Sequence, residues 1–224
     1  MKIKVITAAY RGNERDEVKL TPQTPYEGVE YIAYTNDPTL QVEPWTMVVD
    51  ESITEMRLNA RHKKTQMHKL HPEADYWMWI DSYCKINVDP NQLINKYLTK
   101  YDMVTCPHPE RNNIIEEGNV LLQWKPEQSQ GVQEGVVHYL EQGYTPTTLF
   151  ESKIVIQRNT QAIRDMQDDW WKEIQKHSIR DQISLPYVIW KHGIAVNVFP
   201  GTHSETQLRH NNKPWLKRWQ EITQ

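Results

Sequence analysis

Short apolar segments typical of strands alternate along this chain with segments of helical periodicity. The strand-like segments are 3–9, 31–35, 46–49, 77–80, 103–106, 154–156 and 195–199. The helix-like segments between them are 52–71, 90–98, 132–142, 160–174 and 180–191. This alternation predicts an α/β layered fold, in which helices flank a mostly parallel central sheet.

Length and composition limit the class of protein. The chain has 224 residues and no linker-like segment, so we expect one domain over 1–224, with a polar C-terminal tail from about residue 201. The net charge is −3, which gives no general electrostatic basis for binding nucleic acid. Cys84 and Cys106 lack the spacing of metal ligands, so we expect a reduced pair, as in the cytosol.

Neither a membrane span nor a targeting segment is evident in the sequence. The mean hydropathy is −0.77, and no apolar run approaches the roughly 18 residues that cross a bilayer. Residues 1–6 pass directly into a strand-like pattern and lack the long apolar core of a signal peptide. We therefore expect a soluble, cytoplasmic protein.

The apolar strand at 76–80 ends abruptly on a carboxylate, Asp81. In α/β enzymes a carboxylate at this place reaches the carboxyl edge of the sheet, where ligands bind. The alternative is that Asp81 only caps an Asx-turn after the strand. Tyr83 stands two residues on, where a second carboxylate would have improved a site for a divalent cation.

A stripe of basic side chains follows one face of the helix predicted before this strand, because the spacing is four, three, four and three. Its members are Arg57, Arg61, Lys64, His68 and His71. The stripe is either a solvated basic face or a phosphate-binding surface, since Arg binds phosphate oxygens in a bidentate manner. Arg57 and Arg61 are the phosphate candidates, and we expect the two histidines to pack or to face solvent.

Two predicted helix starts have capping-box spacing. Ser52 pairs with Glu55, and Ser178 pairs with Asp181. Asp181 would favour the helix N-terminus electrostatically, although a functional carboxylate could occupy the same position. We expect Pro186 to bend or break the second of these helices.

The stretch 107–125 is dense in polar residues, and we expect a long functional loop at the sheet edge. Glu116 and Glu117 in this stretch either bind substrate hydroxyls or act as a base. The alternative is a charged surface loop without a function of its own.

Five segments in this order resemble one family. They are Arg57-x-x-x-Arg61-x-x-Lys64 with His71-Pro72; Tyr76-x-x-Trp79-Ile80-Asp81 with Lys85 and Asp89-Pro90; His108-Pro109-x-Arg111 with Glu116-Glu117; Leu149-Phe150-Glu151; and Trp170-Trp171-x-Glu173 with Ser178-x-Arg180-Asp181-Gln182-Ile183-Ser184-x-Pro186-Tyr187. The family is a group of GT-A-like glycosyltransferases long catalogued as a domain of unknown function. Plant hexosyltransferases related to turgor regulation and mucilage are among its members.

The resemblance implies a GT-A fold and transfer of a hexose from a nucleotide-sugar donor to a glycan, glycolipid or other hydroxyl acceptor. The implied donor-binding residues are Ala9, Tyr10, Asn36, Arg57, Arg61, Lys64, Asp81 and Gln182. The implied acceptor-binding residues are His108, Arg111 and Glu116. The catalytic carboxylate is sought among Asp181, Glu151 and Glu117.

A divalent cation, Mn²⁺ or Mg²⁺, is the expected cofactor, with Asp81, His203 and His210 as its expected ligands. The tail segment Lys213-Pro214-Trp215 is similar to the terminal Lys-Pro-Trp of bacterial galactosyltransferases and glycogenin-like enzymes. Gln207 stands where those enzymes have a histidine. Either another residue supplies the missing ligand or the enzyme needs no metal.

Two other functions remain open at this point. The first is a non-catalytic carbohydrate-binding protein, with Trp and Tyr side chains as stacking platforms. The second is a sugar nucleotidyltransferase, which is disfavoured because no Gly-rich phosphate loop stands near the N-terminus. The sequence does not specify the donor sugar or the acceptor. A lipid-linked acceptor would bring the protein to a membrane surface.

Overall fold

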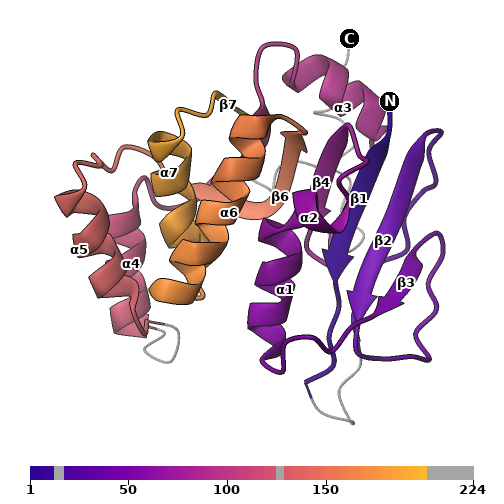
Figure 1. Cartoon of the computed structure of the whole chain (residues 1–224), viewed down its shortest axis with the longest axis horizontal. Helices are drawn as coiled ribbons and strands as arrows, with labels where there is room; N and C mark the ends of the chain where they lie inside the picture. The colour runs from indigo at the N-terminus through magenta and orange to yellow at the C-terminus, as the bar shows by residue number, and fades with distance from the viewer. Residues whose placement is uncertain (13–17, 125–128, 201–224) are drawn as a thin grey trace.

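A seven-stranded sheet in the order β3-β2-β1-β4-β6-β5-β7 forms the centre of the computed structural model (Figure 1). The structure describes residues 1–12, 18–124 and 129–200. The strands are β1 (Ile3–Ala8), β2 (Val29–Thr35), β3 (Thr46–Val49), β4 (Tyr76–Ile80), β5 (Met103–Pro107), β6 (Phe150–Arg158) and β7 (Val196–Val198).

Helices cover the sheet, and α1 and α6 lie side by side against it (Figure 1). The helices are α1 (Met56–Thr65), α2 (Met67–Leu70), α3 (Pro90–Tyr97), α4 (Ile114–Trp124), α5 (Val132–Glu141), α6 (Gln161–Lys176) and α7 (Asp181–Lys191). In the part of the chain that the structure describes, no helix combines the length and the apolar character needed to cross a bilayer.

Strand β4 is buried on both faces, which makes the fold three-layered. Trp77 and Trp79 point into the core that contains the apolar residues of α6 and α7. Met78 and Ile80 point into a second core, which contains those of α3. All four side chains are at most 2% exposed. The α/β architecture predicted from the alternating segments is therefore confirmed.

Strand β6 runs antiparallel to both of its neighbours, β4 and β5, while the other strand pairings of the sheet are parallel. The mostly parallel sheet expected from the sequence is thus confirmed with one reversed strand. The backbone N–H of Asp81 donates to the carbonyl of Lys153 on β6 at 2.9 Å. The N–H of the buried Cys84 donates to the Asp81 carbonyl at 2.8 Å and closes a tight turn after β4.

Helix α1 begins later than its sequence predicts. The carboxylate of Glu55, the N-cap residue, accepts from the N–H groups of Arg57 and Leu58. The Ser52 hydroxyl instead donates to the Asp50 carboxylate at 3.1 Å, so the predicted capping box between Ser52 and Glu55 is wrong. The helix is also not continuous to residue 71, because Gln66 (φ −119°) separates α1 from α2.

The stretch 107–125 is not a long loop, because it contains α4. The Asn113 side chain accepts from the N–H groups of Ile115 and Glu116 at 3.0 Å and caps this helix. Buried Ile114 and Leu121 anchor the helix in the core. Many of the polar residues that suggested a loop lie between residues 108 and 113, before the helix begins, and Glu117 on the helix is buried.

Helix α7 also differs from its prediction. It continues through Pro186 without a break, and Pro186 and its two neighbours in sequence are buried in the core. The predicted capping box of Ser178 and Asp181 is absent. The Ser178 hydroxyl accepts from the Arg180 N–H at 3.2 Å, and the Asp181 side chain binds groups outside its own helix.

Candidate functional site

Three segments that are far apart in the sequence meet near the carboxyl end of β4: helix α1, the start of β6 and the first turn of α7. The contact between Lys64 and Asp181 joins residues 117 positions apart, with Nζ 2.5 Å from Oδ2. The Ser152 hydroxyl donates to the same oxygen at 2.8 Å. Arg61 approaches the other carboxylate oxygen, with Nε 3.2 Å from Oδ1.

The Asp181 carboxylate is a buried anion surrounded by cations. Its side chain is 4% exposed, and that of Lys64 is 2% exposed. Burial alone would raise the pKa of Asp181, but Arg61 and Lys64 outweigh it and hold the pKa well below its usual range. Asp181 therefore stays ionised and fixes the positions of two cations.

Two tryptophans enclose the Lys64 ammonium. Its Nζ lies 5.7 Å from the ring centroid of Trp79 and 5.8 Å from that of Trp170, within the range of cation–π attraction. The Trp79 indole N–H donates to the Asp81 carboxylate at 3.0 Å, and the Trp170 N–H donates to the Asp181 carbonyl at 3.1 Å. The two indoles therefore link the ammonium to both aspartates.

The Asp81 carboxylate, at the exit of β4, is held by aromatic donors. Oδ1 accepts from Trp79, and Oδ2 accepts from the Tyr83 hydroxyl at 3.2 Å. The Asp81 carbonyl accepts the hydrogen bond that closes the turn to Cys84. Asp81 therefore closes this turn through its backbone and also holds its carboxylate in a fixed orientation. Tyr83 stands where a second carboxylate would have improved a cation site, and its hydroxyl instead donates to the Asp81 carboxylate.

A small hollow of about 160 Å³ beside this cluster is lined by three arginines and one isoleucine. The lining residues are Arg57, Arg61, Ile179 and Arg180. Arg57 is exposed, while Arg180 is partly buried and donates to Glu117 at 2.8 Å. Several guanidinium groups around one hollow suit an anion with many oxygens, such as a diphosphate.

A larger hollow of about 340 Å³ lies at the carboxyl ends of the first strands and the start of α1. Its lining residues are Tyr10, Arg11, Gly12, Asn36, Asp50, Glu51, Ile53, Thr54, Met56 and Asn59. Asn36 holds the chain after β1, because its amide accepts from the Arg11 N–H at 2.7 Å and donates to the Arg11 carbonyl at 3.0 Å. Helix α1 contributes residues to both hollows.

Glu117 is a second buried anion, and its side chain is 1% exposed. Burial raises its pKa, but hydrogen bonds and charges from Arg180 and Arg111 outweigh this and lower the pKa. His108 lies beside them, and burial, followed by the charge of Arg111, lowers its pKa to about 4. His108 is therefore neutral near pH 7.

The other residues that the sequence singled out have varied surroundings. Glu151 is buried in β6, and its carboxylate lies 2.6 Å from Lys153 Nζ. The carboxylate of Glu116 accepts from the Asn112 backbone at 2.8 Å and thus supports the start of α4. The Gln182 amide accepts from Arg180 at 2.9 Å. Buried Ala9 follows β1. His203 and His210 lie outside the described residues.

The basic stripe divides into three parts in the structure. Arg57 and Arg61 line the small hollow, and Lys64 is enclosed in the cluster. His68 is buried, with Nδ1 2.7 Å from the Gln167 side chain, and His71 Nε2 lies 3.1 Å from the Tyr34 hydroxyl. Of the two alternatives expected for these histidines, packing or facing solvent, the structure shows packing for both.

Sequence reasoning did not select Ser152, Trp79, Trp170 and Arg180 as site residues. A buried serine or tryptophan gives no signal in a sequence, because its partners come from other segments. Arg180 could have been selected, because it directly precedes Asp181 at a predicted helix start.

Comparison with known proteins gives a family match. The family model of the TOD1/MUCI70 glycosyltransferase-like domain matches residues 28–210. A relative from Arabidopsis thaliana, "Probable hexosyltransferase MUCI70", is 25% identical over 165 residues, which cover 68% of this chain and 28% of the relative. A second relative from the same plant, "Alkaline ceramidase TOD1", is 22% identical over 173 residues, covering 70% of this chain and 37% of the relative.

The chain thus spans about a third of the length of these curated relatives. Among solved structures, a glycosyltransferase involved in the glycosylation of the major capsid of PBCV-1 aligns with a TM-score of 0.48 and 10% identity. The alignment covers 89% of this chain and 82% of that one. The two plant relatives are named for different activities, so neither activity transfers directly to this chain.

Proposed function

This chain belongs to the TOD1/MUCI70 glycosyltransferase-like family, and we propose on that basis that it transfers a hexose from a nucleotide-sugar donor to a hydroxyl group of a glycan or glycolipid. The observation that carries the proposal is the arginine-lined hollow beside Asp81 and the Asp181 cluster. A nucleotide sugar leaves as a nucleoside diphosphate, and an anion of that kind needs several cations at its binding site.

The two hollows give the donor an orientation. The larger hollow, lined by Tyr10 and Asn36, would take the nucleoside, and the small one would take the diphosphate. Arg57 and Arg61 on α1 are spaced four residues apart, so they present guanidinium groups on one helix face to the phosphate oxygens. The sugar would then lie near Asp81, where β4 ends.

The proposed chemical role of the cluster is to stabilise charge on the leaving group. Negative charge grows on the diphosphate as the bond to the sugar breaks, and pre-oriented cations stabilise it without reorganising. In this proposal Asp181 and Glu117 act by holding Arg61 and Arg180 in position. Glu151, paired with Lys153, is the remaining candidate for a base near the acceptor hydroxyl.

The acceptor side is assigned to the region around α4. Arg111 and the neutral His108 flank Glu117, and they offer hydrogen bonds to sugar hydroxyls without a large net charge. Glu116 would contribute only if an acceptor displaced its backbone contact with Asn112.

A divalent cation does not fit well among the described residues of this site. Asp81 supplies one carboxylate, whereas Mn²⁺ or Mg²⁺ prefers several oxygen ligands. The predicted contribution of His203 and His210 lies outside the described part of the chain. The proposal therefore assigns the neutralisation of the diphosphate to the arginines and Lys64, and a metal held by Asp81 and the tail histidines remains a prediction.

The test is a thermal-shift panel of UDP-, GDP-, CMP- and dTDP-sugars, with and without Mn²⁺. A ligand that binds the folded state raises the melting temperature by mass action. We expect one nucleotide class to produce a shift that Arg57→Ala and Asp81→Asn reduce. Arg164→Ala is the matched control, because this arginine binds Asn159 near the start of α6.

Other outcomes would favour the rival functions. Glycan binding without any nucleotide response, and unchanged in Asp81→Asn, would support a carbohydrate-binding protein. Release of pyrophosphate from a sugar phosphate and a nucleoside triphosphate would support a nucleotidyltransferase. Hydrolysis or transfer of the sugar from the responding nucleotide sugar would support the proposal directly.

A further inference from the structure

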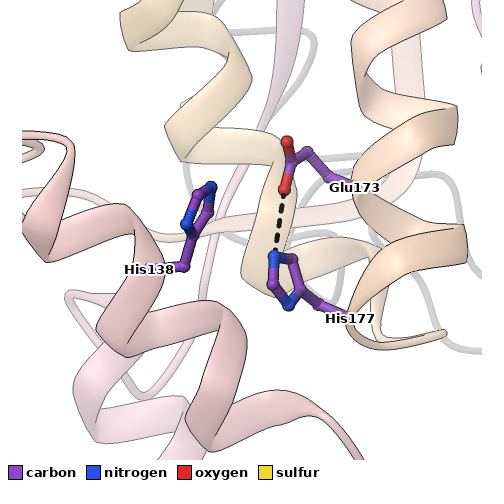
Figure 2. Close-up of side chains that lie close together, drawn as sticks. All are labelled: His138, Glu173 and His177. Carbon is purple, nitrogen blue, oxygen red and sulfur yellow. Dashed lines mark ion pairs between the residues drawn. The ribbon is translucent and has the colours of Figure 1, made fainter.

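Three side chains of metal-binding type converge between α5 and the end of α6, and none of them lines either of the two hollows. They are His138, Glu173 and His177, and their ligand atoms all lie within 4.8 Å of one another (Figure 2). His138 comes from α5, Glu173 from the last turns of α6, and His177 is the residue that ends α6.

Three polar atoms of Glu173 and His177 are buried without a hydrogen-bond partner in the described part of the chain, although the Glu173 carboxylate also interacts with the Tyr139 hydroxyl. His177 is 9% exposed at its side chain. Within the described part of the chain, neither of its ring nitrogens has a hydrogen-bond partner, and the same holds for Glu173 Oε2. A buried polar atom without a partner costs roughly 1–3 kcal/mol, so such atoms usually bind something.

The separation within the pair suits coordination better than a hydrogen bond. His177 Nε2 and Glu173 Oε2 are 3.6 Å apart, which is too long for a hydrogen bond. Two ligands at about 2.0–2.1 Å from a tetrahedral ion lie roughly 3.3 Å apart. The ring of His138 lies 5.1 Å from that of His177 between centroids, and the ligand atoms of all three residues lie within 4.8 Å of one another.

Aromatic side chains surround the cluster. The ring of Tyr139 lies 5.8 Å from that of His177 between centroids, in an edge-on arrangement. Tyr139 and Tyr187 stack beside it with centroids 4.1 Å apart. Gly131 (φ 70°) lets α5 start against His177, because a Cβ there would lie 1.7 Å from the His177 carbonyl oxygen.

We propose that His138, Glu173 and His177 bind a zinc ion, with water as the fourth ligand. Two imidazoles and one carboxylate are a donor set that zinc accepts in tetrahedral geometry. The ion would join α5 to the connection between α6 and α7. That connection leads within three residues from His177 to Arg180, so the site would also restrain one side of the arginine-lined hollow.

The test is a Zn²⁺ titration of the full chain by calorimetry in chelator-treated buffer. We expect one zinc per chain at this site, lost in His177→Ala and weakened in Glu173→Gln. The loss should exceed the roughly 10-fold to 100-fold that removal of an outer-shell partner costs. His138→Ala is the second variant, because this partly exposed residue can be replaced with less risk to folding. Zinc should raise the melting temperature of the wild type more than that of His138→Ala.

Two controls separate this site from other zinc ligands. His192→Ala removes a histidine that contacts Asp169 instead, and the double variant His203→Ala, His210→Ala removes the tail histidines. Both should keep the zinc. The proposal is overturned if the wild type binds no zinc more tightly than about 100 μM, or if the folded His138→Ala protein binds it as the wild type does.

Discussion

Loss of Lys64 should strongly destabilise the chain, because this residue neutralises a buried carboxylate. Replacing it with methionine keeps most of the length of the side chain and leaves Arg61 as the one ion-pair partner of Asp181 among the described residues. Removing one partner of a buried pair typically costs about 3–5 kcal/mol, and we expect a loss of that size in the free energy of unfolding from urea titration.

Lys69→Met is the matched control for this variant. Lys69 pairs with Asp168, but its side chain is 59% exposed, so its loss should cost less than about 1 kcal/mol. If Lys64→Met and Lys69→Met were equally stable, the cluster around Asp181 would not contribute to folding as described.

Asp50 should make the stability of the chain sensitive to acid. Burial raises its pKa, but Lys63, with Nζ 2.7 Å away, and the neighbouring Ser52 outweigh this and lower the pKa from 3.8 to about 2. Because the folded-state pKa is the lower one, the stabilisation is present above about pH 4 and is lost as the pH falls toward about 2.

Asp50→Asn should therefore reduce stability at neutral pH and flatten its decline in acid. The measurement is the free energy of unfolding in urea at about pH 6 and about pH 3. A variant as acid-sensitive as the wild type would contradict the assignment of this carboxylate.

At the level of elements, Glu55 and Ser52 are the two candidate N-caps of α1, and a substitution at each distinguishes them. Glu55→Ala removes the acceptor for two backbone N–H groups and should cost about 1 kcal/mol. Ser52→Ala should cost less than half as much, because Ser52 lies outside the helix. Thermal or urea unfolding of the two variants measures the difference, and a larger cost for Ser52→Ala would restore the cap predicted from the sequence.

The elements that the sequence predicted correctly carry their signals locally. Asp89 with Pro90 and Thr160 mark the starts of α3 and α6, and both act as N-caps in the structure. Helix α4 was missed because its cap, Asn113, stands among other polar residues. The sequence places the start of α1 too early, because the Ser52 hydroxyl donates to the Asp50 carboxylate and does not cap the helix. This choice of partner depends on side-chain positions that spacing alone does not contain.

On the scale of the whole molecule, the order of the strands predicts which amides are best protected from hydrogen exchange. β4 lies at the centre of the sheet and is buried on both faces, whereas β7 is an edge strand of three residues. We expect native-state exchange in β4 only through global unfolding and faster exchange in β7 through local opening. Equal protection of the two strands, measured by mass spectrometry, would contradict this order.

The layered fold could be predicted from the sequence because the strands and most of the helices have a recognisable periodicity, α4 being an exception. The site could be read only in part. Arg61 and Asp81 were selected from local patterns, but the ion pair between Lys64 and Asp181 and the bond from Arg180 to Glu117 join distant segments. Contacts of this kind arise from the way the layers stack, and no spacing along the chain encodes them.

The turn after β4 gives the protein a built-in chemical reporter. Cys84 is buried, and its N–H bonds to the carbonyl of Asp81, while burial raises the pKa of its thiol. An alkylating reagent attacks the thiolate of an accessible cysteine, so Cys84 should react only when this turn opens. A Cys106→Ala background leaves Cys84 as the one thiol of the chain. Its labelling rate should fall when a nucleotide sugar binds beside Asp81, and an unchanged rate with a bound donor would place that donor elsewhere.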